Sequence, residues 1–292
     1  MSGLSTDGVH TPVWVDGQLV AWDKAQLHAA SFGLNNASCV FEGIRVYNGD
    51  IFALEEHAAR LLSSAHAIGL EISYTRELII NAVVETVHAS AKTNAYVRPL
   101  VWSGSEILGI IPDETPAHMA ILVVPWKNIY EGKSSGIRLT WSRWMRPAAT
   151  MAPVTAKASC NYVIASLARR EANARGYDDA LLLDHRGYVA EATGANVFIV
   201  LEDRLVTPIA DACLPGITRR IVMDLAHEQG IEVTQKRLRP ADIVQASEIF
   251  LTGTASELQP VCSVGDQQLP QEHPVTSALT EAYRQATGHN RT

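Results

Sequence analysis

One lysine, Lys157, lies in a run of small residues, Thr155-Ala156-Lys157-Ala158-Ser159. None of the other lysines in the sequence is enclosed in this way. A lysine held away from water changes its pKa readily, and its neutral amine can attack a carbonyl carbon. A solvated surface lysine would fit the same residues, so this run by itself leaves both interpretations open.

A second titratable residue, Glu191, also has small neighbours, because Ala190, Ala192 and Thr193 flank it. It lies between two strands that the apolar pattern predicts at 179–184 and 194–200. A carboxylate in this setting is either a satisfied surface group or one placed to meet a positive charge inside the protein.

Two segments can offer hydrogen-bond donors to an anion. Residues 214–219, Leu-Pro-Gly-Ile-Thr-Arg, precede a helix predicted at 218–229. Thr218 can cap that helix, and backbone N–H groups at a helix start bind anions. Residues 252–256, Thr-Gly-Thr-Ala-Ser, form a hydroxyl-rich turn. A plain N-cap and an ordinary loop are the alternative interpretations.

Three arginines fall on elements that are otherwise apolar. Arg45 either faces solvent or forms a positive wall of a pocket. Arg60 lies beside the apolar face of its helix, where it either snorkels to water or holds an anion. Burying Arg98 requires an anionic partner, on this protein or on a ligand. Arg45 lies in a hairpin predicted at 41–52, Arg60 in a helix predicted at 55–68 and Arg98 in a strand predicted at 95–102.

The motifs of several other chemistries are absent. No G-x-G-x-x-G follows a strand and no G-x-x-x-x-G-K-[ST] occurs, so dinucleotide and P-loop sites are excluded. There is no H-E-x-x-H or G-x-S-x-G, and the histidines show no metal-ligand spacing, so no metal site is expected. An enclosed lysine, an enclosed glutamate, anion sites and arginines together match the needs of pyridoxal 5′-phosphate. This is the cofactor that the residues favour.

Strand and helix patterns must position these residues. A first hairpin is predicted at 13–20, with Asp16-Gly17 as its turn. The other predicted elements are helices at 75–91, 160–175, 240–246 and 275–286, and strands at 119–124, 137–141 and 248–251. A polar, glycine-containing stretch at 127–136 suits a linker. We therefore expect two domains of mixed α/β structure.

Composition indicates a globular protein that acts on small molecules. The chain has 292 residues, of which 47% are hydrophobic and 19% charged, enough to bury a substantial core. A net charge of −7 argues against nucleic-acid or anionic-membrane partners. The four widely spaced cysteines suggest free thiols. The start of the sequence lacks a secretory signal pattern and no apolar run is long enough to span a membrane, so a cytoplasmic location is expected.

Eight runs in the sequence resemble the fold-type IV, or class IV, aminotransferases, and among them the branched-chain amino acid aminotransferases. They occur in the family's order and cover residues 13 to about 265. The runs are Val-Phe-Glu-Gly-Ile-Arg at 40–45, Glu-His-Ala-Ala-Arg-Leu at 56–61, Tyr-Val-Arg-Pro-Leu at 96–100, Ala-Lys-Ala at 156–158, Asn-Tyr at 161–162, Glu-Ala-Thr-Gly-Ala-Asn-Val-Phe at 191–198, Leu-Pro-Gly-Ile-Thr-Arg at 214–219 and Thr-Gly-Thr-Ala at 252–255.

The resemblance implies roles around pyridoxal 5′-phosphate. Lys157 would be the catalytic residue, which forms the Schiff base with the cofactor and moves the proton between substrate Cα and cofactor C4′. Glu191 would face the pyridine nitrogen, and Tyr162 would hydrogen-bond the phenolate oxygen. The phosphate would be held by Arg60, the Ile217 and Thr218 backbone N–H groups, and the Thr218 and Thr254 hydroxyls.

The resemblance also implies a substrate site. Tyr96, Arg98 and the Thr254-Ala255 backbone would lie near the α-carboxylate. Arg45 would admit the distal carboxylate of glutamate or 2-oxoglutarate. The side-chain pocket would be shaped by Phe41, Gly43, Ile110 and Trp126.

The architecture implied is that of the D-amino acid aminotransferase-like fold. It has a small N-terminal α/β domain at 1–129, a linker at 130–135 and a large C-terminal α/β domain at 136–292 that carries the lysine. The cofactor would lie at the domain interface. A homodimer or a higher assembly of dimers is implied, with each site completed by the neighbour's small domain.

The sequence departs from the family in two places. Asn36 stands where an aromatic residue is usual, and Ser159-Cys160 replaces the usual Gly-Gly after the lysine. The first departure leaves open a D-amino acid or (R)-amine transaminase of the same fold. An aminodeoxychorismate lyase-like enzyme and a cofactor-free binding module are further alternatives. We expect the second departure to crowd the turn before the next helix.

Overall fold

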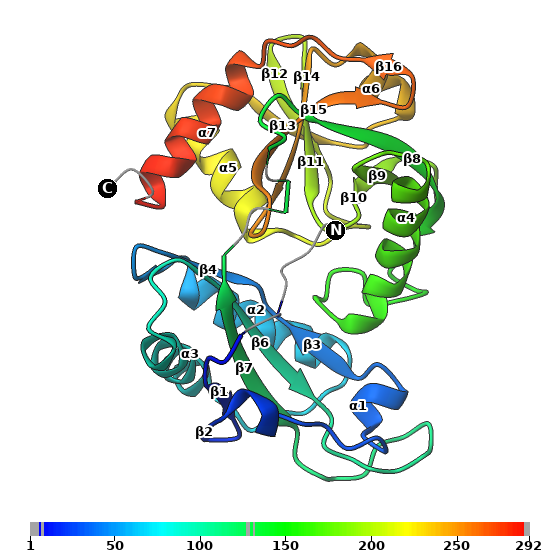
Figure 1. Cartoon of the computed structure of the whole chain (residues 1–292). Coiled ribbons are helices and arrows are strands. Elements are labelled where there is room, and N and C mark those ends of the chain that lie inside the picture. Colours follow the sequence, from blue (N-terminus) through cyan, green and yellow to red (C-terminus); the bar gives the residue numbers. More distant parts are fainter. Residues whose placement is uncertain (1–5, 7–8, 127–128, 131, 289–292) are drawn as a thin grey trace. The chain divides into compact units, whose positions relative to one another are not determined.

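The computed structural model describes residues 6, 9–126, 129–130 and 132–288. The chain divides into two compact units. Unit 1 comprises Met1–Lys127 and Ala156–Asn161, and unit 2 comprises Asn128–Thr155 and Tyr162–Thr292. Each unit contains a β-sheet with helices packed on it (Figure 1), so the fold is mixed α/β as expected.

A seven-stranded sheet forms the centre of unit 1. Its strands are β1 (Val13–Val15), β2 (Gln18–Val20), β3 (Cys39–Phe41), β4 (Ile44–Tyr47), β5 (Asp50–Ile51), β6 (Ala95–Trp102) and β7 (His118–Pro125). The order is β2-β1-β7-β6-β4-β5, with β3 also paired to β6. Every one of these pairings is antiparallel, which suits a sheet built from hairpins.

Among the described residues, two helices pack against this sheet, two short helical segments precede them, and one short segment follows later in the chain. The helical elements of unit 1 are η1 (Trp22–Lys24), α1 (Phe32–Asn35), α2 (Leu54–Ala67), α3 (Arg76–Ser90) and η2 (Ser159–Asn161). Helix α2 buries Ala58, Leu61 and Ala65 at helical spacing in the core of the unit. Helix α3 begins after Thr75, whose Oγ1 accepts the Leu78 N–H at 3.1 Å.

A nine-stranded sheet forms the centre of unit 2. Its strands are β8 (Ile137–Arg146), β9 (Asp179–Asp184), β10 (Val189–Ala192), β11 (Asn196–Leu201), β12 (Arg204–Pro208), β13 (Val233–Lys236), β14 (Glu248–Gly253), β15 (Glu257–Val264) and β16 (Gln267–Gln268). The order is β10-β9-β8-β15-β14-β11-β12-β13, with β16 paired to β15. Strand β8 runs parallel to β9 and β15, and β12 runs parallel to β13.

In the described part of unit 2, four helices cover this sheet. They are α4 (Tyr162–Ala174), α5 (Ile217–Glu228), α6 (Pro240–Gln245) and α7 (Pro274–Ala286). Helix α4 packs on β8 and β9, whereas α5 and α7 contact each other and β14 (Figure 1). The α7 N-terminus receives the buried carboxylate of Glu248, which accepts the Val275 and Thr276 N–H groups at 2.9 and 2.8 Å.

The periodic elements follow the sequence prediction closely. Both hairpins form, and Asp16, Gly17, Asn48 and Gly49 all have positive φ, as the expected turns require. The helices expected at 55–68, 75–91, 160–175, 240–246 and 275–286 are α2, α3, α4, α6 and α7. The strand expected at 137–141 is longer, because β8 continues to Arg146 across an irregularity in its pairing with β9.

The segment that carries Lys157 belongs to unit 1, whereas we expected it within a C-terminal domain at 136–292. Its flanking residues, Ala156 and Ala158, are buried in the core of unit 1, and Ala158 bridges to Val40 of β3. The predicted linker 130–135 includes residue 131, which lies outside the described residues. Tyr130 is buried and donates to Asp179 Oδ2 at 2.6 Å. The boundaries 1–129 and 136–292 stay a prediction.

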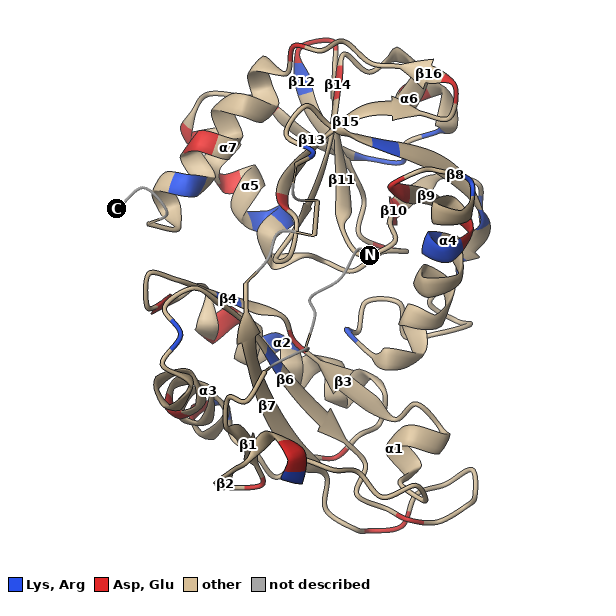
Figure 2. Ribbon diagram, in the orientation of Figure 1, with Lys and Arg blue, Asp and Glu red and all other residues tan. Residues whose placement is uncertain are grey.

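Figure 2 shows Lys and Arg interspersed with Asp and Glu on both units.

None of the helices in the described part of the chain has the length and apolar character that a membrane span needs.

Candidate active site

Lys157 is held by two elements of unit 1. Its backbone N–H donates to Ser64 Oγ of α2 at 3.0 Å, and its carbonyl accepts the Phe41 N–H at 3.1 Å. The small side chains of Ala156 and Ala158 allow this close packing, since both are buried. The backbone of the lysine is therefore fixed between a strand end and a helix, which is the kind of support a reactive side chain needs.

The Phe41 ring joins the lysine to one of the strand-borne arginines. Lys157 Nζ lies 5.1 Å and Arg98 Cζ 4.4 Å from the ring centroid. Arg98 Nη2 donates to Tyr96 Oη at 2.9 Å, while its Nε is buried with no hydrogen-bond partner among the described residues. No carboxylate in the described part of the chain pairs with Arg98. An anion on a ligand, one of the two expected partners, stays a prediction.

Arg45 is not at the surface, so the solvent-facing interpretation is wrong. It is 1% exposed in strand β4. Its guanidinium carbon lies 3.4 Å from the centroid of the Trp126 ring and 4.3 Å from that of Tyr47. Two aromatic rings thus hold a buried cation by contact with its guanidinium group. This is consistent with the positive pocket wall that the sequence offered as the alternative.

Arg60 is paired with a carboxylate inside unit 1. Its Nε and Nη2 donate to Oε1 and Oε2 of Glu42 at 2.7 and 2.8 Å. His57 Nδ1 lies 2.6 Å from Glu42 Oε2. Although burial alone would raise the pKa of Glu42, the charge of Arg60 and the hydrogen bonds of Arg60 and His57 hold that pKa far below its usual range. Arg60 therefore does not simply snorkel to water.

His57 is expected to make folding stability depend on pH. Burial lowers its pKa in the folded protein; the charge and hydrogen bond of Glu42 oppose this shift, and repulsion from Arg60 and Lys157 adds to it. The unfolded chain takes up a proton near pH 6.5, where the folded protein does not, so stability falls as pH decreases below that value. This titration adds at most about 1.4 kcal/mol per pH unit to the slope of the unfolding free energy against pH. A His57→Asn variant should lose this contribution. Urea unfolding between pH 5 and about pH 8 measures it; an unchanged slope contradicts it.

Glu191 in unit 2 is buried on strand β10 and faces a positive charge, as one of its two interpretations predicted. Its Oε1 lies 3.0 Å from Arg146 Nε. Its Oε2 accepts the Leu214 N–H at 3.3 Å and lies 3.5 Å from Asn196 Nδ2. Arg146 is itself buried and also donates to the carbonyls of Val154 and Ala212. The carboxylate is thus fixed at both oxygens.

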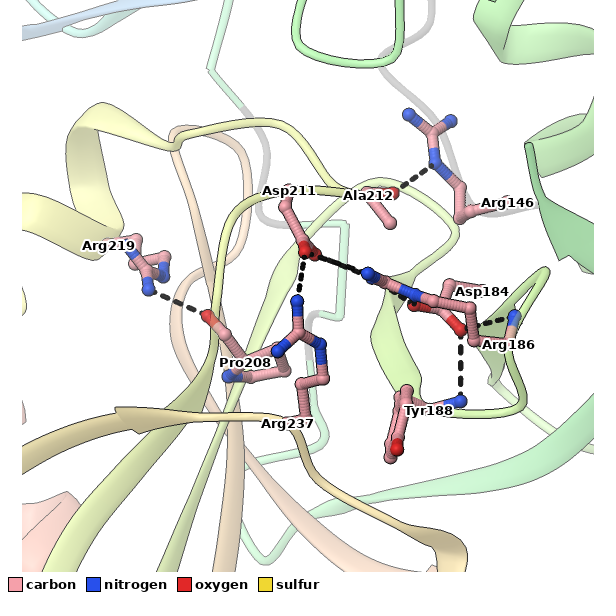
Figure 3. A network of polar contacts seen from close by, with 9 residues as sticks. All are labelled: Arg146, Asp184, Arg186, Tyr188, Pro208, Asp211, Ala212, Arg219 and Arg237. Carbon is pink, nitrogen blue, oxygen red and sulfur yellow. Dashed lines mark hydrogen bonds and ion pairs between the residues drawn. The ribbon is translucent and has the colours of Figure 1, made fainter. Parts of the chain in front are cut away.

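The loop that supports this carboxylate is anchored by a charged network (Figure 3). Asp211 accepts two bonds from Arg186, at 3.0 and 2.8 Å, and one from Arg237 at 3.0 Å. Arg186 also binds Asp184 at the end of β9. Figure 3 shows Asp211 next to Ala212, whose carbonyl receives Arg146 Nε. The network therefore fixes the backbone next to the Arg146–Glu191 pair.

The start of α5 has the features of an anion site, although its cap differs from the prediction. The N-cap is Gly216, with no side-chain cap, and Thr218 is the second helical residue. A Cβ on Gly216 would lie 2.1 Å from Asn196 Oδ1, so a glycine is required for this close approach. Ile217 and Thr218 are buried. Thr254 and Ala255 lie in the half-buried turn between β14 and β15.

The remaining predicted positions have varied surroundings. Tyr162 is the first residue of α4, Trp126 is half-buried, and Ile110 is 94% exposed. Asn36 follows α1, and its Nδ2 donates to the Gly109 carbonyl at 2.9 Å.

The turn after the lysine is not crowded. Ser159–Asn161 form the short helix η2, whose Asn161 Nδ2 donates to the Ala156 carbonyl at 3.0 Å. Cys160 is exposed, Ser159 is half-buried, and neither is among the described residues with positive φ. The expectation of crowding is therefore wrong, because a 3₁₀ turn suits these side chains where glycine would also fit.

Comparisons with known proteins place the chain in a family. The "Amino-transferase class IV" family matches residues 39–264. The chain belongs to the class IV aminotransferases. A probable branched-chain-amino-acid aminotransferase of Rickettsia bellii is 40% identical over 274 residues, which are 93% of this chain and 94% of that protein.

Solved structures of this family agree. The branched-chain aminotransferase of Thermoproteus uzoniensis with norvaline has a TM-score of 0.92 and 36% identity, and covers 97% of this chain and 96% of its own. A second branched-chain amino acid aminotransferase, from T.th., is complexed with N-(5′-phosphopyridoxyl)-L-glutamate and has a TM-score of 0.91 and 35% identity, with the same coverage. This chain is an aminotransferase, and its cofactor is pyridoxal 5′-phosphate.

The residues of this aminotransferase fit that cofactor. No carboxylate of the described residues pairs with the Arg98 guanidinium. A substrate carboxylate would therefore meet no competing carboxylate from those residues. The α5 N-terminus has no side-chain cap, so its first N–H groups are oriented towards an acceptor that the helix does not supply. Within the described residues, no group of three or more His, Cys, Asp or Glu could hold a metal ion.

Sequence reasoning missed three residues that contact the candidate site residues, namely Glu42, Ser64 and Arg146. Glu42 stood in the quoted Glu-Gly-Ile-Arg run, and its single acidic side chain in an apolar strand was a usable signal. Ser64 lies seven residues after His57, on the same face of α2. Arg146 carried no signal, because the irregularity in β8 shifts the alternation before it.

Gly43 gives the Tyr96 hydroxyl its place, and we expect Gly43→Ala to weaken substrate binding. A Cβ at this position would lie 2.1 Å from Tyr96 Oη, so the hydroxyl must move away from Arg98. A hydrogen bond to a charged group contributes about 1.5–3 kcal/mol, which corresponds to an increase in KM of about 10- to 100-fold. Steady-state kinetics on Gly43→Ala, alone and combined with Tyr96→Phe, measure it. If displacement of the hydroxyl is the cause, Gly43→Ala raises KM by a smaller factor in the Tyr96→Phe background than in the parent enzyme. Equal factors in both backgrounds would contradict this explanation.

Proposed function

We propose that this aminotransferase moves the amino group between the branched-chain L-amino acids leucine, isoleucine and valine and 2-oxoglutarate. Arg45 carries the proposal. A buried guanidinium against the Trp126 and Tyr47 rings gives an apolar surface with one cation. Such a wall accepts an aliphatic side chain in one half-reaction and a distal carboxylate in the other. The named relatives, which are branched-chain aminotransferases, support the same substrates.

We propose the cofactor roles that the family resemblance implies, and the contacts around Lys157 and Glu191 support them. We propose that Lys157 holds the cofactor through its aldehyde carbon and that Glu191, fixed by Arg146, meets the pyridine nitrogen. The phosphate is assigned to Arg60, the first N–H groups of α5 at Ile217 and Thr218, and the Thr218 and Thr254 hydroxyls, with Tyr162 at the phenolate oxygen. The position of the cofactor at the domain interface stays a prediction from the family resemblance.

The chemistry assigns one task to each group. Bound pyridoxal 5′-phosphate withdraws electrons from the substrate Cα. An ionised Glu191 keeps a proton on the nitrogen that it faces. Lys157 Nζ takes and returns the proton at Cα, a task that contributes typically about 10²–10⁴-fold. Arg98 with Tyr96, and the backbone of Thr254-Ala255, orient the α-carboxylate, while Phe41, Gly43, Ile110 and Trp126 shape the side-chain pocket.

An amino-donor panel tests this proposal. Purified protein is mixed with L-leucine, L-valine, D-alanine or (R)-1-phenylethylamine, with 2-oxoglutarate or pyruvate as acceptor. We expect turnover of the L-branched donors with 2-oxoglutarate. Turnover of D-alanine or the (R)-amine alone would assign the enzyme to the alternative that Asn36 left open. A separate incubation with aminodeoxychorismate tests the lyase alternative, because a lyase would release pyruvate from that substrate without a 2-oxo acid acceptor.

We further propose that the enzyme is a homodimer or an assembly of dimers. Ile107, Leu108, Ile110 and Ile111 form an exposed apolar loop, with exposed fractions of 44–94%. Apolar surface of this kind marks an interaction site. A second copy covering the loop would place Ile110 in the neighbour's side-chain pocket. Light scattering should therefore give a dimer or larger, and Ile110→Asp should both dissociate it and lower activity. A wild-type monomer with full activity overturns this.

We propose a cytoplasmic location for the protein. The four cysteines are unbridged in the described residues, which suits a reducing compartment. Cell fractionation with an antibody against the chain tests it.

A further inference from the structure

Helix α2 carries three polar side chains on one face, His57, Arg60 and Ser64. They are spaced by three and four residues, which places them in line along an α-helix. His57 and Arg60 contact Glu42, and Ser64 accepts the N–H of Lys157. One rigid helix thus supports both the lysine backbone and the arginine to which we assigned the cofactor's phosphate.

Glu42 is the centre of this arrangement. It is 0% exposed, and its carboxylate lies within 3.2 Å of four nitrogen atoms. Arg60 uses Nε and Nη2 together, and this side-on pairing fixes the plane and the rotation of the guanidinium. His57 holds the shared oxygen Oε2, and so does the N–H of Gly43. The carboxylate itself therefore cannot turn.

A buried ion pair is a weak source of stability, because desolvation offsets much of the attraction. Orientation is a better account of this one. A long arginine side chain that is held in place before the ligand arrives loses less conformational freedom on binding. The side-on pair occupies one edge of the Arg60 guanidinium and so determines the direction in which the other edge points.

We infer that Glu42 is a positioning residue that holds Arg60 for the phosphate of pyridoxal 5′-phosphate, and that His57 holds Glu42. The inference rests on the phosphate role proposed for Arg60. It predicts that the cluster gives the apoenzyme its preference for the phosphorylated cofactor over unphosphorylated pyridoxal. Glu42 also follows Phe41, whose ring contacts Lys157 and Arg98. Glu42 thus connects Arg60 to the end of strand β3, which lies beside Lys157.

The competing account is that Glu42 only balances charge. Two substitutions separate the accounts. Glu42→Gln removes the charge and the second acceptor oxygen, whereas Glu42→Asp keeps the charge but withdraws the carboxylate by one methylene. If orientation matters, both variants lose affinity for the phosphorylated cofactor. If only charge matters, Glu42→Asp binds as the parent does.

The measurement is a fluorescence titration of apoenzyme with pyridoxal 5′-phosphate and, separately, with pyridoxal. Both ligands present the same aldehyde and ring, so only the phosphate differs. We expect both Glu42 variants to bind pyridoxal 5′-phosphate about tenfold more weakly, with pyridoxal affinity unchanged within about twofold. Glu55→Gln is the matched control, because Glu55 is an exposed acid on α2 that pairs with Arg76. It should leave both affinities unchanged.

Two results would overturn the inference. Equal loss for both ligands would mean that Glu42 maintains the fold of the unit, and unchanged affinity would mean that Arg60 needs no support. Arg60→Gln is measured alongside. If Arg60→Gln binds both ligands as the parent does, the phosphate role of Arg60 fails. If it loses only the phosphorylated ligand while the Glu42 variants do not, the inference alone fails.

Variants of His57 keep the test decisive if the Glu42 variants do not fold. His57→Leu removes the donor but leaves the Glu42–Arg60 pair, so we expect a loss of about threefold for pyridoxal 5′-phosphate only. His57→Asn keeps a nitrogen donor near the same place and should restore affinity. Equal affinities of both variants for pyridoxal 5′-phosphate would show that His57 does not hold Glu42. Circular dichroism of each apoenzyme confirms that the fold is retained.

Discussion

Lys157→Ala is expected to lower kcat/KM for transamination by at least about 10²–10⁴-fold, since proton transfer by a positioned base contributes that much. The substitution should affect little else. The backbone of residue 157 is held by Ser64 and Phe41, and these contacts use its N–H and carbonyl groups. Alanine also matches the residues on either side. The loss can therefore be assigned to the amino group of the side chain.

Lys133→Ala is the matched control for this prediction. Lys133 is half-exposed and its Nζ lies 3.5 Å from Asp178 at the surface. A surface pair of this kind contributes at most about 1 kcal/mol, so activity should be unchanged. Initial rates with L-leucine and 2-oxoglutarate give the activities. Borohydride reduction followed by peptide mass spectrometry should find the cofactor on Lys157 in the parent and on no peptide of the variant.

Ordinary transaminase turnover by Lys157→Ala would remove the central assignment. If the loss of activity is accompanied by a large fall in thermal stability, the substitution has disrupted the fold and the loss cannot be assigned to the side chain. Added primary amines offer a further check, because a small amine can take the proton in place of the missing side chain. Partial recovery of rate with such amines is expected for Lys157→Ala alone.

Much of the fold could be predicted, because the regular elements obey short-range rules. Helix α2 shows its apolar spacing in the sequence, and the two hairpins show Asp-Gly and Asn-Gly turns. Strands with weaker patterns were missed. Strand β13 has the sequence Val-Thr-Gln-Lys and is partly exposed, so it has no clear alternation. Its place is determined by pairing with β12, which is a long-range contact.

The site was predictable in its residue types more than in its contacts. Lys157 and Glu191 stood out because small neighbours surrounded them. Which unit holds the lysine depends on Ser64, 93 positions away, and no local pattern contains that information. Anion binding was one of two interpretations of Arg60, but its pairing with Glu42 joins a strand end to a helix and could be seen only in three dimensions.

Arg146→Met is expected to destabilise the apoenzyme by about 3–5 kcal/mol, which is typical when one partner of a buried ion pair is removed. Arg146 Nε lies 3.0 Å from Glu191 Oε1, and both side chains are nearly inaccessible to water. Methionine fills much of the same volume without charge. The carboxylate then keeps its neutral donors, the Leu214 N–H and Asn196 Nδ2, but loses the compensating charge.

Urea unfolding of the single and double variants measures the coupling. Glu191→Gln should cost less than Arg146→Met, because the Val154 and Ala212 carbonyls still accept hydrogen bonds from the arginine. The double variant should be more stable than Arg146→Met, since no buried charge is then left to compensate. A double variant as unstable as the sum of both changes would contradict the charge argument and favour a packing role for Arg146.

The same three variants separate stability from catalysis. If Arg146 acts by holding the charge and position of Glu191, the double variant recovers stability but not activity, because the proposed partner of the pyridine nitrogen is still missing. Recovery of activity together with stability in the double variant would contradict the role proposed for Glu191 at the pyridine nitrogen.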